Sequence, residues 1–309
     1  MPYPTTTDII LMVRPARFGF NSQTAKNNSF QTNDQSLISE EISERARQEF
    51  DVFVDKLRSV GVHIIVVEDT AEPVKHDAVF PNNWFSTHPN GLLITYPVFS
   101  PMRRLERRED IVHRLQQEYG YKQHIRLEIY EATERYLEGT GSLILDREHQ
   151  VAYACRSIRT DDDLVEKFVE AIGFEQHLFD AVDRNGEPIY HTNVMMALGI
   201  SFCVICLDSI PDPEQRRSIV QSLEGNGKEV VAITMSQLEA FAGNMIQVNS
   251  ATDGTPYLVM SQQAYESLAA EQITQLEKHT QLLYSDLRTI ETYGGGSARC
   301  MMAEIYPAG

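Results

Sequence analysis

The chain has 309 residues, of which 42% are hydrophobic and 23% charged, as in an ordinary globular protein. Its 27 Lys and Arg against 44 Asp and Glu give a net charge of −17, which argues against a nucleic-acid or anionic-membrane surface because phosphate contacts need clustered cations. The amino end lacks the features of a signal peptide, no apolar run approaches the ~20 residues that cross a bilayer, and four cysteines do not make a disulfide scaffold. We expect a cytoplasmic protein without nucleic-acid or membrane partners.

The first half of the chain alternates short apolar runs with amphipathic segments. Apolar residues at helical spacing predict a helix over 36–60, closed by Gly61, and residues 21–33 form a polar loop. Further helices are predicted at 111–119 and at 161–172, the latter opened by acidic residues. Strands are predicted at 8–13, 63–67, 80–86, 91–98, 125–130, 142–145 and 151–154.

The second half repeats this alternation. Helices are predicted at 212–223, 237–241, 262–268 and 273–284, and strands at 194–198, 202–206, 229–233, 245–248 and 257–260. The pattern indicates an α/β or α+β chain with no obvious linker, so we expect residues 1–309 to form one domain. No glycine cluster has the context of a dinucleotide or phosphate-binding loop, because Gly139-Thr140-Gly141 precedes a predicted strand rather than opening a helix.

The segment near the carboxyl end combines a glycine run with a thiol. Gly294-Gly295-Gly296 allows a sharp turn, and Cys300 follows it just before a short apolar run. A loop that delivers a thiol at the mouth of a strand suits a nucleophile. The alternative is a glycine turn with a buried free cysteine, since cysteine is among the most buried residue types.

Two further segments carry groups that could act with this thiol. His191 lies at the start of a predicted strand, where a histidine can serve as an acid or base near neutral pH. Glu138 precedes Gly139 and could orient a histidine ring and stabilise its charged form. The alternatives are a surface or capping histidine and a turn glutamate facing water.

Amides and arginines mark two more candidate binding segments. Asn82 and Asn83 lie within an aromatic run beside Trp84, and buried asparagines need partners, so they organise a loop or contact a ligand. Arg103 and Arg104 belong to the one basic cluster of the chain and could clamp a carboxylate, or could belong to a solvated helix start.

The C-x-x-C pair does not suggest a metal site. Cys203 and Cys206 lie within one predicted strand, where residues three apart face opposite sides, and no second pair exists in the sequence. We therefore expect both to be core residues and expect no metal and no cofactor.

Together these segments resemble the pentein, or amidinotransferase-like, superfamily of guanidine-modifying enzymes. The resemblance runs from Arg14-Pro15 to the carboxyl end and is closest to the branch described as citrulline utilisation hydrolases. It implies a pseudo-fivefold α/β propeller of short-stranded ββαβ-like modules around a central pocket. It also implies catalytic roles for Cys300 as nucleophile, His191 as general acid/base and Glu138 as its orienting partner.

The resemblance also implies a set of substrate-binding residues. Carboxylate binding is expected from Arg104 together with Arg103 or Arg159. Many arginine-directed relatives have aspartates where this chain has Asn83 and Asn193. An amide can donate to a ureido oxygen, which a carboxylate cannot, so the pattern leans toward citrulline. The implied substrate-binding set is Phe80, Asn83, Arg103, Arg104, Arg159, Asn193 and Gly296.

The expected reaction is hydrolysis of citrulline to ornithine, carbon dioxide and ammonia through an S-carbamoyl intermediate on Cys300. The alternatives are hydrolysis of the guanidino group of arginine or of an acylated or methylated arginine, and amidino transfer to an amine. A member of the fold that binds a small molecule without turnover is the non-enzymatic alternative. The expected partner is a small amino-acid substrate, and a homodimer is left open.

Overall fold

The computed structural model describes residues 3–25, 28, 30–32 and 38–308. Within these residues the strands form five sheets of three strands each. The strands are Ile9–Arg14 (β1), His63–Glu68 (β2), Phe85–His88 (β3), Leu92–Thr95 (β4), Gln123–Arg126 (β5), Ile144–Asp146 (β6), Val151–Cys155 (β7), Glu175–Phe179 (β8), Met196–Leu198 (β9), Phe202–Ile205 (β10), Glu229–Ala232 (β11), Ile246–Asn249 (β12), Pro256–Ser261 (β13), Gln281–Ser285 (β14) and Ala303–Glu304 (β15).

Helices connect and cover these strands. They are Ser39–Ser59 (α1), Glu109–Tyr119 (α2), Gly139–Ser142 (α3), Asp162–Ile172 (α4), Pro213–Gly225 (α5), Met235–Glu239 (α6), Gln262–Ser267 (α7), Ala270–Glu277 (α8) and Arg288–Gly294 (α9). Short 3-10 turns are Pro81–Asn83 (η1), Arg103–Glu106 (η2), Leu127–Thr133 (η3), Thr192–Val194 (η4), Leu207–Ser209 (η5) and Ala298–Met301 (η6). In the described ranges no helix combines the length and the apolar character needed to cross a membrane.

Each sheet has the same internal order, which makes it one ββαβ-like module. Its middle strand pairs antiparallel with one neighbour and parallel with the other, as β4 does with β3 and β5. The parallel partner is reached through a crossover that contains a helix, which parallel neighbours require. In the fifth module β15 pairs with β1, and β1 with β2, so this sheet joins the two ends of the chain. The mixed α/β fold of short-stranded modules predicted from the sequence is confirmed.

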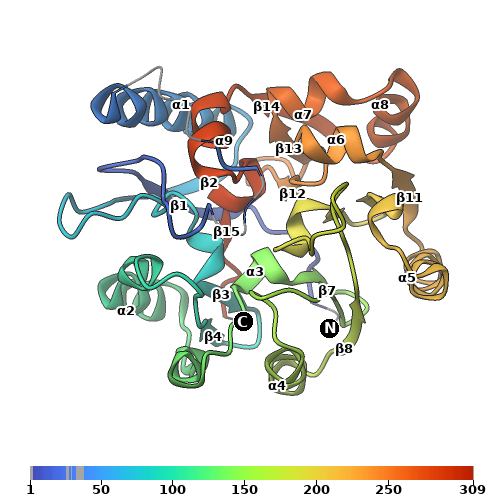
Figure 1. Cartoon of the computed structure of the whole chain (residues 1–309), viewed down its shortest axis with the longest axis horizontal. Coiled ribbons are helices and arrows are strands. Elements are labelled where there is room, and N and C mark those ends of the chain that lie inside the picture. The colour runs from blue at the N-terminus through green and yellow to red at the C-terminus, as the bar shows by residue number, and fades with distance from the viewer. Residues whose placement is uncertain (1–2, 26–27, 29, 33–37, 309) are drawn as a thin grey trace.

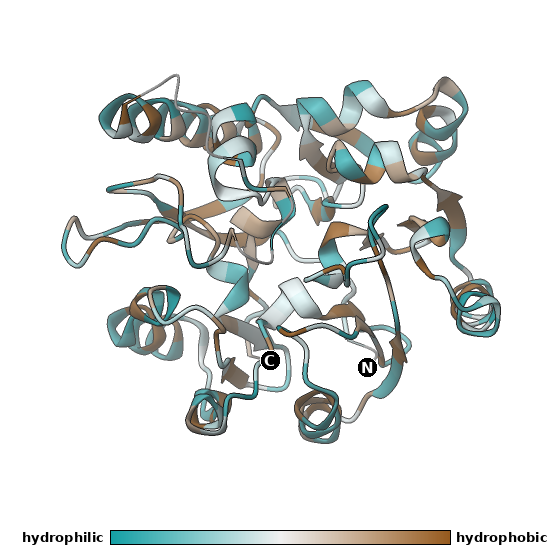
Figure 2. Ribbon diagram, in the orientation of Figure 1, coloured by the Kyte–Doolittle hydropathy of each residue, from teal (hydrophilic) through white to brown (hydrophobic). Residues whose placement is uncertain are grey.

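The modules surround a common centre. Figure 1 shows α1, α2, α4, α5 and α8 at the periphery and α3 near the middle of the molecule. Figure 2 shows both hydrophilic and hydrophobic residues on the outer helices, as expected for helices with one face on a sheet. The crossover helices therefore lie outside, around this centre.

Helix α4 illustrates how local sequence specifies these outer helices. The Asp161 side chain accepts a hydrogen bond from the Leu164 backbone N–H, and Gly173, with φ of 74°, ends the helix in the left-handed conformation. Phe168 is among the residues of its buried stripe, and burying a side chain of this size contributes about 1.5–3 kcal/mol.

Several predicted boundaries and element types are wrong. The predicted helix 273–284 ends at Glu277, and its last part is strand β14, which pairs in parallel with β13. The predicted strand 125–130 is β5 followed by the 3-10 turn η3. The strand β8 and the helix α9 were not predicted. Residues 26, 27, 29 and 33 of the predicted loop, and residues 36 and 37 of the predicted first helix, lie outside the described part of the chain.

Candidate active site

The candidate residues lie at equivalent places in successive modules, a few residues before the first strand of each sheet. Asn83 ends η1 ahead of β3, Glu138 precedes α3 ahead of β6, and His191 precedes η4 ahead of β9. Asn244 follows the same rule ahead of β12, and Cys300 lies in η6 ahead of β15. The fivefold repeat therefore brings five chain positions, up to 217 residues apart (300 − 83), to one hub.

A small cavity of about 20 Å³, named here the Cys300 cavity, lies at this hub. Among the residues that line it are seven of the predicted site: Phe80, Asn83, Arg103, Arg159, His191, Gly296 and Cys300. Glu138 and Asn193 lie behind this lining, in contact with His191 and Cys300 respectively. Arg104 is not brought to the cavity.

The Cys300 sulfur is held by two amide groups. Its Sγ accepts hydrogen bonds from Asn193 Nδ2 at 3.4 Å and from Asn244 Nδ2 at 3.2 Å. The orientation of the Asn244 amide follows from its partners, because its Oδ1 accepts from the Arg299 backbone N–H at 3.1 Å and its Nδ2 donates to the Asn193 carbonyl at 2.9 Å. Two donors aimed at one sulfur stabilise its anionic form, the form that acts as a nucleophile.

The imidazole of His191 is held by Glu138. Its Nε2 lies 2.8 Å from Glu138 Oε2, and both residues are buried. Burial alone would raise the pKa of Glu138, but Arg159, His191 and Arg103 outweigh it and hold that pKa well below its ordinary value. Glu138 is therefore ionised at neutral pH. Its Oε1 accepts the Phe99 backbone N–H at 2.9 Å, which fixes the carboxylate plane.

The protonation state of His191 follows from this pairing. Burial lowers the pKa of His191 below its ordinary value of 6.5, and the Glu138 carboxylate opposes this only in part. The ring is therefore neutral at pH 7. Because an ionised carboxylate can only accept, the proton is on Nε2, and Nδ1 keeps the lone pair that a general base needs.

Arg103 is committed to the interior of the site. It forms a two-point ion pair with Glu106, with Nε–Oε1 at 3.0 Å and Nη2–Oε2 at 2.9 Å, and its Nη1 donates to Asn83 Oδ1 at 2.8 Å. Because arginine only donates, the Asn83 oxygen must face it. The Asn83 Nδ2 donor then remains, and it has no hydrogen-bond partner within the described residues.

The other two predicted arginines differ in position. The Arg159 guanidinium lies 4.8 Å from the centre of the Tyr190 ring and 3.5 Å from Glu138 Oε2. Arg104 instead donates to the carbonyl oxygens of Val98 and Phe99, outside the lining. Of the three, Arg159 remains the candidate for contacting a substrate carboxylate.

Two glycines of the Glu138 segment allow close packing at the hub. Gly139 has a φ of 50°, and a Cβ there would lie 2.4 Å from the Asn82 carbonyl oxygen. A Cβ on Gly141 would lie 2.5 Å from Asn83 Nδ2 and 2.8 Å from His191 Nδ1. Neither position tolerates a side chain, so both glycines serve this packing. Gly139 also begins α3, so the prediction that this segment does not open a helix is wrong.

Sequence reasoning missed two polar groups of the site. Asp77 lines the Cys300 cavity; its Oδ2 accepts from Asn21 Nδ2 at 2.7 Å, and its Oδ1 lacks a partner among the described residues. Asn244 contacts the sulfur directly. The sequence offered one signal for each of them. Asp77 is an acidic residue six positions before Asn83, and Asn244 lies just before a predicted strand, as Asn193 does.

The described residues hold no group of three or more His, Cys, Asp or Glu side chains suited to a metal ion. All four cysteines are free and buried, and Cys203 and Cys206 belong to the core as expected.

Known proteins match this chain in family sequence and in fold. A family model described as N,N dimethylarginine dimethylhydrolase, eukaryotic, matches residues 14–307. A search of curated proteins finds no match.

Solved structures share the fold at low sequence identity. ArgZ, described as an arginine dihydrolase from the ornithine–ammonia cycle in cyanobacteria, superposes with a TM-score of 0.74 at 16% identity, over 96% of this chain and 40% of that one. Unliganded AgrE gives a TM-score of 0.74 at 17% identity, over 96% and 39%. A histidine-to-glycine variant of dimethylarginine dimethylaminohydrolase, in an adduct with S-methyl-L-thiocitrulline, gives 0.68 at 15% identity, over 97% and 99%. The chain thus spans about two fifths of ArgZ and AgrE, and these likenesses show the pentein fold predicted from the sequence.

Proposed function

The chain belongs to the N,N dimethylarginine dimethylhydrolase family within the pentein superfamily, and on that premise we propose that it hydrolyses a C–N bond of a guanidino or ureido amino acid through Cys300. The observation that carries the proposal is a cysteine sulfur held by two amide N–H groups beside a neutral histidine whose ring is fixed by a buried carboxylate. Nucleophile, base and orienting group are thus all present around one cavity. The common hub of the five sheets supports residues 1–309 as one catalytic domain.

The proposed steps use these groups in turn. Cys300 attacks the central carbon of the substrate, and the proton released by the thiol or by the bound substrate passes through His191 to the departing nitrogen. His191 then removes a proton from water, which attacks the thioester-like carbon and frees the sulfur. Glu138 holds the ring and stabilises its charged form between the two steps.

Asp77 favours a guanidino substrate as the first candidate. It places in the Cys300 cavity a carboxylate whose Oδ1 has no hydrogen-bond partner among the described residues, and a guanidinium supplies the donors and the positive charge that such a group binds. The family description and the ArgZ description both refer to arginine compounds. With arginine and complete hydrolysis, one arginine and two waters would give ornithine, carbon dioxide and two ammonia.

Citrulline is the second candidate, and Asn83 is the observation that favours it. Its Nδ2 donor has no hydrogen-bond partner in the described part of the chain and can bind a ureido oxygen but not a guanidinium. One citrulline and one water would give ornithine, carbon dioxide and ammonia.

A substrate panel separates the two candidates. We expect release of ammonia from arginine or citrulline, or of dimethylamine from N,N-dimethylarginine, measured as kcat/KM. This release should be abolished in Cys300→Ala and retained in Cys206→Ala, because the Cys206 thiol lies in the core. Asp77→Asn should lower kcat/KM for a guanidino substrate by about 10- to 100-fold, the value of one hydrogen bond to a charged group, and citrulline turnover by less. Full turnover in Cys300→Ala would refute the mechanism.

A further inference from the structure

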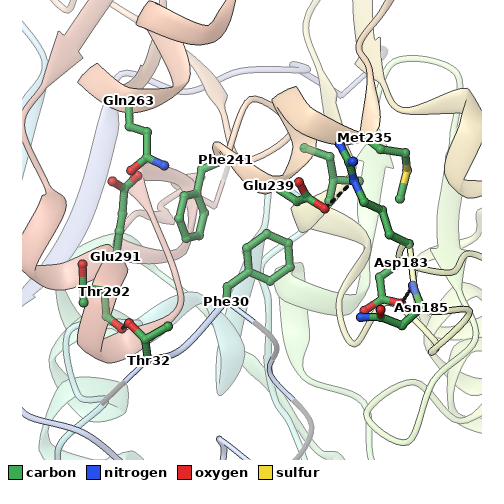
Figure 3. Close-up of a pocket in the computed structure, with 12 residues that line it drawn as sticks. Phe30, Thr32, Asp183, Asn185, Met235, Glu239, Phe241, Gln263, Glu291 and Thr292 are labelled. Atoms are coloured by element: carbon green, nitrogen blue, oxygen red, sulfur yellow. Dashed lines mark hydrogen bonds and ion pairs between the residues drawn. The ribbon is translucent and has the colours of Figure 1, made fainter. Parts of the chain in front are cut away.

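A second and larger cavity lies between α6, α7 and α9. Its volume is about 360 Å³, within the range of small-molecule sites, and none of its lining residues lines the Cys300 cavity. We name it the Glu291 cavity. Figure 3 shows Gln263, Glu291 and Thr292 along one side, the rings of Phe30 and Phe241 in the middle, and Glu239, Asp183 and Asn185 along the other.

Glu291 gives this cavity an unpaired buried carboxyl oxygen. The residue is only 2% exposed, and its Oε1 accepts a hydrogen bond from Ser297 Oγ at 2.6 Å. Its Oε2 has no hydrogen-bond partner within the part of the chain that the structure describes. A buried carboxyl group without a partner is unfavourable, and a hydrogen-bond donor, above all a cationic one, would offset this cost.

The rest of the lining is acidic at the rim and aromatic in the middle. Asp183 and Glu239 add two carboxylates, and Arg184 is the single cation among the described residues that line the cavity. Arg184 is already paired with Glu239, with Nε–Oε1 at 2.6 Å. The ring centres of Phe30 and Phe241 lie 5.2 Å apart, which provides a surface for an alkyl chain or for the face-on approach of a cation.

We propose that the Glu291 cavity is a second small-molecule site that binds an organic cation, a primary ammonium or guanidinium on a short alkyl chain. The charged head would lie beside Glu291 and the chain over Phe241. Anions are disfavoured by the excess of carboxylates, and neutral ligands leave the Glu291 oxygen without charge compensation. The proposal stands on this cavity alone and does not depend on the reaction at Cys300.

Binding would be accompanied by proton release near neutral pH. Burial raises the pKa of Glu291 to about 7; the hydroxyl groups of Ser261 and Ser297 oppose this increase, and the nearby carboxylates of Glu49 and Asp286 add to it. A bound cation favours the ionised form, so part of the protein population loses a proton on binding. Titration calorimetry at pH 7 in buffers of different ionisation enthalpy measures this release.

The test uses n-butylammonium as the probe, with 1-butanol as the neutral match, titrated into the full chain. We expect the ammonium to bind at least 10-fold more tightly than the alcohol. Glu291→Gln keeps the shape and should weaken ammonium binding at least 10-fold, with loss of the proton release. Glu277→Gln, an exposed change on α8 that removes the same charge, should leave binding unchanged.

Two more variants locate the site and keep the test independent of how Glu291→Gln folds. Gln263→Lys places a competing ammonium on the half-buried α7 side of the cavity and should abolish probe binding. Asp77→Asn alters the Cys300 cavity and should leave probe binding unchanged. Equal affinity for ammonium and alcohol, normal binding in Gln263→Lys, or a loss in Asp77→Asn as large as that in Glu291→Gln would each overturn the proposal.

Discussion

Replacing Asn244 by alanine removes one of the two amide donors that contact the Cys300 sulfur, and we expect the thiol to become less reactive. A hydrogen bond to a charged group is worth about 1.5–3 kcal/mol, so loss of this donor weakens the stabilisation of the attacking sulfur anion by a factor of roughly 10 to 150. The alkylation rate falls only by about the square root of this factor, because a less stabilised sulfur anion is a stronger nucleophile. Alkylation of Cys300 at a fixed pH near neutrality should therefore slow by about 3- to 10-fold.

The same substitution should lower the stability of the fold. It leaves the Arg299 N–H and the Asn193 carbonyl without their present partners, both in the buried hub. At about 1–3 kcal/mol for each buried unpaired group, the free energy of unfolding should fall by about 2–6 kcal/mol. Urea denaturation of wild type and variant measures this difference.

Iodoacetamide labelling followed by peptide mass spectrometry gives the rate at Cys300 itself. The other cysteines make little contribution, because burial raises the pKa of Cys155 to about 12 and also raises that of Cys203 and Cys206. Asn249→Ala, on the strand that follows Asn244, is the matched control, since its amide donates to Thr6 and not to the sulfur. An alkylation rate in Asn244→Ala equal to that of the control would refute the role assigned to this donor.

Three further predictions concern the groups around the thiol. Glu138→Gln should lower kcat by about 10²- to 10⁴-fold, because the carboxylate that sets the His191 tautomer is lost; a rate within a few-fold of wild type in an ammonia assay would contradict this. Because the folded-state pKa of His191 lies below 6.5, the unfolded chain binds more protons as pH falls below that value. The unfolding free energy of the wild type should therefore fall as the pH drops, and His191→Gln should reduce the slope of that fall by up to ~1.4 kcal/mol per pH unit. Urea titrations of the variant at pH 5 to 7 that match wild type would exclude this contribution of His191. Arg103→Met leaves Glu106 and Asn83 unpaired and should lower the unfolding free energy by about 3–5 kcal/mol, whereas an unchanged urea midpoint would show that the pair adds nothing.

Much of the candidate site could be predicted because each of its residues lies beside a local signal. Cys300 follows a glycine run, Glu138 precedes Gly139, His191 lies just before a predicted strand, and Asn83 lies in an aromatic run. These signals depend only on residues that are adjacent in the chain. The sequence alone therefore predicted the α/β class and the candidate nucleophile, base and orienting group.

The roles of Arg103, Arg104 and Asp77 could not be predicted in the same way. Arg103 and Arg104 are adjacent in the basic cluster, yet one lines the Cys300 cavity and the other turns to the Val98 carbonyl. The only local signal for Asp77 is its position six residues before Asn83, which does not distinguish it from a solvated loop aspartate. Its role becomes clear only in the folded chain, where Asn21 binds one carboxylate oxygen and the other oxygen has no hydrogen-bond partner among the described residues.

Strand β14 shows that local sequence was also insufficient to predict every element of secondary structure. Its residues Gln281–Ser285 have a spacing that suits a helix as well as a strand, and pairing with β13 decides between them. The sequence by itself determined the elements with strong periodicity and the glycines where two chain segments must approach closely. Tertiary structure alone decided which polar groups face one another across the hub, because those contacts join modules far apart in the chain and have no expression in local sequence.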